Sequence, residues 1–156
     1  MADTGDTRDT ADTGESWAER RRQGAAIQGQ RLAREQAAET EQAQALVTRF
    51  TAEAVAVDLP TEELRAVDSG GRRYRTGVRG WLLRRDKRSG IGADGSFYLL
   101  GFVGGAGARL SARLRGVRLR PSEPPLVMGR GGRDGESIPL ADLLDRRLGT
   151  GDDSGS

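Results

Sequence analysis

Residues 90–103 read GIGADGSFYLLGFV and carry the clearest β-hairpin signal in the chain. The dipeptide Asp94-Gly95 tolerates positive φ in a tight turn, so we expect residues 90–93 to pair with residues 96–103 across it. The second of these segments is apolar almost throughout, which predicts a central strand covered on both faces. The fold is therefore expected to contain an antiparallel sheet.

Further strands are predicted on either side of this hairpin. Residues 64–67 are expected to pair with residues 72–76 across the turn sequence DSGG, although residues 60–63 (PTEE) are also compatible with the start of a short helix. Residues 78–83, which include Trp81, form another strand candidate. Residues 117–120 and 126–128 are predicted as brief strands at edges or ends, because three prolines lie around them.

A long helix is predicted before the sheet. Ser16-Trp17-Ala18-Glu19 fits a capping box, and no proline follows until Pro60, so the helix is expected to run from Ser16 to about Val57. Its second half carries an apolar stripe at helical spacing that needs a surface to pack against. The stripe consists of Ala43, Leu46, Val47, Phe50, Ala54 and Val57.

Two shorter helices are considered near the C-terminus. Residues 108–115 fit either a strand with an outer row of arginines or a short helix stopped by Gly116, and we favour the helix. Leucines at 140, 143, 144 and 148 predict a final helix, with Ser137 as its cap, Pro139 in its first turn and Gly149 at its end.

These predictions together give an α+β fold in four parts. Residues 1–15, with a net charge of −4, are expected to be a disordered acidic tail, and residues 150–156, at −2, a second tail. Residues 16–59 form the long helix, whose second half packs on the sheet. Residues 60–149 form a small basic domain with a mainly antiparallel sheet of about five strands, closed by the C-terminal helix.

Self-association through the long helix is a weaker expectation. A heptad register with Leu32 and Leu46 at d leaves only five of nine seam positions apolar, which is poor support for a coiled coil. We therefore favour a monomer, with a homodimer through this helix as the alternative.

Composition excludes several classes of chemistry. The chain contains no His and no Cys, which removes Ser-His-Asp and Cys-His catalysis, zinc sites and disulfides. No apolar run approaches the roughly 18 residues that cross a bilayer, and residues 1–10 do not resemble a signal peptide. We expect a cytoplasmic protein that is not an enzyme, has no cofactor or metal and does not contact a membrane.

The densest charge run lies in residues 72–88, where the net charge is +7. Such a run predicts binding to phosphates of RNA or DNA, and Tyr74, Trp81, Phe97 and Tyr98 are candidates for stacking on bases if they are exposed. In the alternative interpretation, the rings fill a small core and the arginines solvate its exterior. Of the 25 basic residues, 24 are Arg, as expected of a genome rich in G and C. An arginine cluster in this chain is therefore weaker support for a phosphate-binding site than it would be elsewhere. The candidate residues are Arg72, Arg73, Arg75, Arg79, Arg84, Arg85, Lys87 and Arg88.

A second candidate is the glycine-rich loop before the final helix. Arg130, Gly131, Gly132 and Arg133 are candidates for an anion-binding loop, but the Lys and Ser/Thr of a P-loop are missing. Asp134 and Glu136 offer too few oxygen ligands for a convincing cation site. An ordinary connector is the favoured interpretation for this segment.

The sequence thus leads to a ranked set of functions. The first is a non-catalytic interaction or adaptor protein with an unknown protein partner. The alternative is a nucleic-acid-binding module that uses the basic run, and a small-molecule enzyme is third. We also expect the acidic N-terminal segment to fold back over the basic domain and compete with polyanions.

Overall fold

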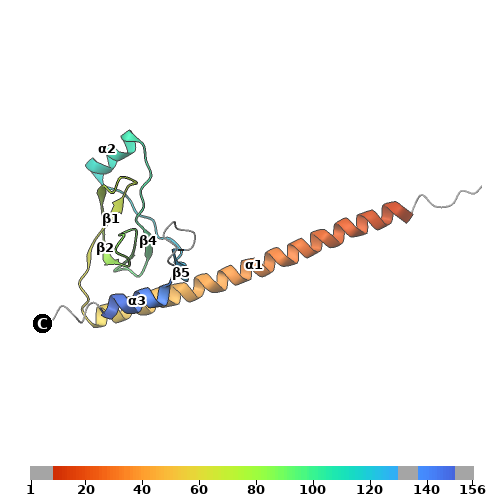
Figure 1. Cartoon of the computed structure of the whole chain (residues 1–156), viewed down its shortest axis with the longest axis horizontal. Helices are drawn as coiled ribbons and strands as arrows, with labels where there is room; N and C mark the ends of the chain where they lie inside the picture. The colour runs from red at the N-terminus through yellow and green to blue at the C-terminus, as the bar shows by residue number, and fades with distance from the viewer. Residues whose placement is uncertain (1–8, 130–136, 150–156) are drawn as a thin grey trace, which may run out of the picture. The chain divides into compact units, whose positions relative to one another are not determined.

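The computed structural model describes residues 9–129 and 137–149 and confirms the predicted α+β class (Figure 1). The chain divides into two compact units, Met1–Ala38 and Glu39–Ser156. All strands, the two short helices and the last part of the long helix belong to the second unit. The elements are α1 (Asp9–Ala56), β1 (Glu62–Val67), β2 (Arg73–Leu82), β3 (Ser89–Gly92), β4 (Phe97–Leu99), α2 (Ala106–Arg115), β5 (Val127–Met128), β6 (Ile138–Pro139) and α3 (Leu140–Gly149).

Helix α1 begins earlier than the sequence predicts. It starts at Asp9 instead of Ser16, so the expectation that residues 9–15 belong to a disordered tail is wrong. This segment has no proline, and its acidic residues lie near the positive end of the helix dipole, where negative charge is stabilising. Within residues 9–38, the large apolar side chains of Trp17, Ile27 and Leu32 are exposed. The remainder of the predicted N-terminal tail and the tail at 150–156 lie outside the described residues.

The main core lies between the end of α1, one face of the sheet and α3. Ala43, Val47, Phe50 and Ala54 are buried as predicted, whereas Val57 lies beyond the helix and is exposed. The edge of one ring meets the face of the other in the pair formed by Phe50 and Trp81, whose centroids are 5.5 Å apart. Helix α3 lies alongside this part of α1 (Figure 1). The same core also contains Ile91 and Phe97 from the sheet and Leu140, Leu143 and Leu144 from α3.

Four antiparallel strands form the main sheet in the order β1-β2-β3-β4. The two predicted hairpins are confirmed, with Ala66 opposite Tyr74 and Ile91 opposite Phe97. Residues 78–83 do not form a separate strand, because β2 continues through most of them.

The prediction of a long central strand at 96–103 is wrong. Strand β4 ends at Leu99 and lies at one end of the strand order. Its following residues instead bond to the opposite end of the sheet, where the Val67 N–H donates to the Leu100 carbonyl and the Phe102 N–H donates to the Val67 carbonyl. The sheet therefore curls until its two edges meet, which buries Leu100 beyond the strand.

The elements after the sheet partly match the predictions. Residues 108–115 lie in α2, as favoured, but residues 117–120 do not form a strand. Strands β5 and β6 pair as a small separate sheet, and Pro139 lies in β6 instead of in the first turn of α3. Among the described residues, no helix is both long and apolar enough to cross a membrane.

Candidate polyanion-binding site

A bulge in β2 shapes the candidate site. Leu64 of β1 pairs with Val78, but Ala66, two residues later, pairs with Tyr74, so β2 contains two extra residues at this point. The Thr76 hydroxyl donates to the Leu64 carbonyl, and the Val78 N–H donates to the Thr76 hydroxyl oxygen over 3.2 Å. Gly77 has φ near +75°, a conformation that side chains disfavour. The bulge therefore depends on both the hydroxyl at 76 and the glycine at 77.

The chain that leaves α2 lies against this bulge. Gly116 ends the helix with φ near +80°, and its N–H donates to the Ala112 carbonyl. The next N–H, that of Val117, donates to the Arg75 carbonyl over 2.7 Å. This bond brings residues 115–118 beside β2, although about 40 residues separate them in the chain.

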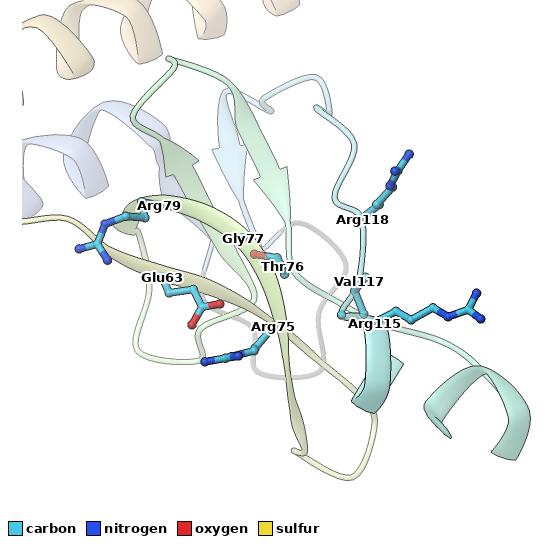
Figure 2. Close-up of a pocket in the computed structure, with 9 residues that line it drawn as sticks. Glu63, Arg75, Thr76, Gly77, Arg79, Arg115, Val117 and Arg118 are labelled. Carbon is cyan, nitrogen blue, oxygen red and sulfur yellow. The ribbon is translucent and has the colours of Figure 1, made fainter. Parts of the chain in front are cut away.

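A groove of about 640 Å³ lies between these two segments, and we call it the basic groove. Its described lining includes four arginines and one acid, Glu63, whose carboxylate lies 3.2 Å from the Nε of Arg65. Figure 2 shows two of the arginines extending to one side of β2 and two to the other. The basic groove is lined by Glu63, Arg75, Thr76, Gly77, Arg79, Arg115, Gly116, Val117 and Arg118.

The arginines of the basic groove are largely uncompensated. Arg79 donates to the Thr61 carbonyl over 2.7 Å, which fixes its position without neutralising its charge. Within the described part of the chain, Arg75, Arg115 and Arg118 form no salt bridge. Because the four guanidinium groups point in different directions, they suit a ligand with several spaced anionic groups better than a single small anion.

The structure divides the predicted basic run among several places. Only Arg75 and Arg79 line the basic groove, while Arg73 and Lys87 line a smaller cavity of about 200 Å³ that also includes Arg65. Arg84 and Arg85 line a third cavity, next to α3. Arg72 and Arg88 line none of these three cavities. The run is thus spread around the sheet instead of forming one continuous patch.

Two of the groove arginines, Arg115 and Arg118, were not predicted as binding residues from the sequence. Arg115 and Arg118 follow Arg109 and Arg113 in residues 104–122, a segment that contains five arginines and no acid. That one-sided charge was a usable signal. Their position beside β2, however, depends on the bond between Val117 and Arg75, which no local pattern predicts.

The predicted stacking role of the aromatic residues is wrong. Tyr74, Trp81, Phe97 and Tyr98 are all at most 5% exposed, so these rings fill the core and cannot stack on bases. The alternative interpretation of the rings is therefore confirmed. Any nucleic acid at the basic groove would contact the protein through charge.

A buried carboxylate holds the elements that frame this region. Asp68 accepts hydrogen bonds from the N–H groups of Gly70 and Arg72 and from the Tyr74 hydroxyl, each at 2.9 Å. Its pKa is lowered, chiefly by the bond from the Arg72 N–H, with a smaller contribution from the Tyr74 hydroxyl, while burial acts in the opposite direction. Arg109 of α2 lies 3.7 Å from the same carboxylate. Asp68 therefore joins the first hairpin to α2.

Other predicted sites remain without a structural account. Arg130, Gly131, Gly132 and Arg133, together with Asp134 and Glu136, lie outside the described residues. Among the residues that are described, no cluster of three or more acidic, His or Cys side chains is arranged to hold a metal ion.

Comparisons with protein-family models, with curated proteins and with solved structures gave no match to this chain.

Proposed function

We propose that the unit of residues 39–156 is a non-catalytic binding module whose basic groove contacts the phosphate backbone of a nucleic acid. The observation that carries this proposal is the convergence of two distant segments, β2 and residues 115–118, on one groove with four arginines. The one acid among its described lining residues, Glu63, already has Arg65 as a partner. Binding would be independent of base sequence, because it rests on phosphate contacts.

The test compares two double variants with the same change in charge. R75Q/R118Q removes one arginine from each side of the basic groove. R85Q/R88Q removes two exposed arginines of the predicted run that do not line the groove. Binding of a labelled, mixed-sequence single-stranded oligonucleotide is measured by fluorescence anisotropy at several salt concentrations.

The groove variant is expected to bind on the order of tenfold more weakly at about 0.1 M salt, with a salt slope lower by about 1.4 for two lost phosphate contacts. The R85Q/R88Q variant should keep most of the affinity. Equal losses in both variants would mean that only net charge matters, and a wild-type protein that does not bind at all would remove the proposal.

A protein partner is the second candidate, and α2 provides the observation that favours it. Ala112 packs inward at 4% exposure, while Leu110 and Leu114 on the opposite side of the helix are 59% and 77% exposed. Leucines four residues apart are neighbours on a helix, so these two together offer an apolar surface to a protein partner. A partner recruited by α2 should be retained by R75Q/R118Q and lost by L110S/L114S in a pull-down from the native host.

A further inference from the structure

Every aromatic ring in the unit of residues 39–156 packs within the protein. Five of the six rings are at most 5% exposed, namely Phe50, Tyr74, Trp81, Phe97 and Tyr98. The sixth, Phe102, is half-buried and packs against Tyr74 with the ring centroids 5.2 Å apart. Residues 130–136 and 150–156 contain no aromatic residue. A nucleic acid bound by this unit therefore gains no stacking on an exposed ring, which is the contact that many single-strand binders use.

The remaining aromatic residue, Trp17, belongs to the other unit of the chain. Its side chain is 59% exposed, and the guanidinium group of Arg20 lies 5.0 Å from the ring centroid. The Nε of Arg20 also donates to the Ser16 carbonyl over 3.1 Å. Trp17 is not among the residues that line the basic groove. Stacking on this ring would be a separate contact, which a single substitution can test.

The basic groove offers positive charge at four separate points. Within the described residues, Arg75, Arg115 and Arg118 form no salt bridge, and Arg79 is held by its bond to the Thr61 carbonyl. The guanidinium groups extend to both sides of β2 (Figure 2). A flexible single strand loses conformational freedom when its phosphates are fixed at several points, whereas the phosphates of a duplex already have fixed spacings. A duplex also has the higher charge density, so each contact releases more counterions.

We propose that the basic groove prefers double-stranded nucleic acid to single strands and contacts only the phosphates. This inference rests on the proposed function and narrows its ligand class. Four phosphate contacts correspond to a salt slope of about −3.6 for duplex DNA and about −2.8 for a single strand. If the two affinities are equal at about 1 M salt, these slopes give a duplex preference of about sixfold at about 0.1 M and about tenfold at about 0.05 M.

The test compares four labelled probes with the same strand length on the full chain, by fluorescence anisotropy at several salt concentrations. The probes are a mixed-sequence DNA duplex, an RNA duplex, the single DNA strand and an abasic single DNA strand. At least one duplex is expected to bind more tightly than the single strand, by a factor that grows as salt is lowered. Which duplex binds more tightly identifies the preferred helix geometry. The single strands with and without bases should bind within about twofold of each other, because the contacts are to phosphates.

Three variants locate the preference. R75Q/R118Q leaves two contacts in the groove and should reduce the duplex preference to about 2.5-fold at about 0.1 M salt. R85Q/R88Q, which has the same change in charge outside the groove, should keep the wild-type preference. W17A should bind the single strand as the wild type does. Circular dichroism checks that the variants are folded.

Several results would overturn this inference and leave the proposed function standing. These are a single strand that binds as tightly as both duplexes, a strand with bases that binds much more tightly than the abasic strand, weaker single-strand binding by W17A, or an unchanged duplex preference in R75Q/R118Q. If none of the four probes binds to the wild type, the proposed function and this inference both fail.

Discussion

Among single residues, Asp68 joins the first hairpin to α2 through its side chain. Its buried carboxylate accepts three hydrogen bonds within the first hairpin and lies near Arg109 of α2. An asparagine has nearly the same shape but carries no charge, and its amide nitrogen is a donor that would face other donors. We therefore predict that D68N unfolds at a lower denaturant concentration than the wild type at pH 7.

The pH dependence of this difference follows from the lowered pKa of Asp68. A carboxyl group whose pKa is lower in the folded chain contributes stability above its ordinary pKa and loses that contribution as pH falls through the folded value. The difference in unfolding free energy between the wild type and D68N should thus be largest near neutral pH and should become smaller below about pH 4. Urea denaturation at several pH values measures it, and a gap that is constant with pH would contradict the ionic role.

Gly80 is a second residue on which the sheet depends. A Cβ atom at this position would lie 2.0 Å from the Ile91 carbonyl oxygen and 2.7 Å from the Cα of Gly92, so strands β2 and β3 would have to separate. We predict that G80A destabilises the fold by roughly 1–3 kcal/mol in urea denaturation, as for other overpacked sites. G101A, where no atom lies within 4 Å, should change stability by no more than about 0.5 kcal/mol.

Among the elements, the end of α1 supplies one wall of the main core. Phe50 is 2% exposed and packs edge-to-face with Trp81, whereas Val55 on the same helix is 63% exposed. We predict that F50A costs about 3–5 kcal/mol of unfolding free energy and that V55A costs less than about 0.5 kcal/mol. Because the Trp81 indole lies against Phe50, unfolding of the core can be followed by tryptophan fluorescence during denaturation. Equal effects would mean that α1 is not part of the core.

The elements also show which features the sequence could predict. Asp94-Gly95 and the DSGG turn fix two hairpins locally, and the stripe through Val47 and Phe50 identifies the buried face of α1. These signals lie within a few residues of the structure that they predict. The elements that they define were therefore found, with errors mainly at their ends, such as the start of α1 at Asp9.

Long-range contacts account for what the sequence did not predict. Residues 96–103 are apolar enough for a central strand, but the bonds between Val67 and residues 100–102 replace that arrangement with a curled sheet. In the same way, the run of residues 72–88 indicated the arginines of β2 but not Arg115 and Arg118, which reach the groove from beyond α2. A charge run in sequence shows which residues are basic, and the topology decides which of them share a surface.

Across the whole molecule, positive and negative charge are separated along the chain. Residues 1–15 carry −4, whereas the complete chain carries +2. Negative charge on the same molecule weakens the attraction of the protein for an external polyanion, and salt screens this effect. The proposed nucleic-acid affinity should therefore depend on the acidic segment as well as on the basic groove.

We predict that deletion of residues 2–15, which changes the net charge from +2 to about +6, increases affinity for a labelled oligonucleotide severalfold at about 0.05 M salt. The increase should disappear at about 0.5 M salt, where the Debye length is shorter than the spacing between most of these charges. A variant of full length in which the five acids of this segment become Asn or Gln is the control, because it removes charge without shortening the chain. If charge causes the effect, this variant should behave like the deletion. An affinity unchanged by both at every salt concentration would show that the charge of the acidic segment does not influence polyanion binding.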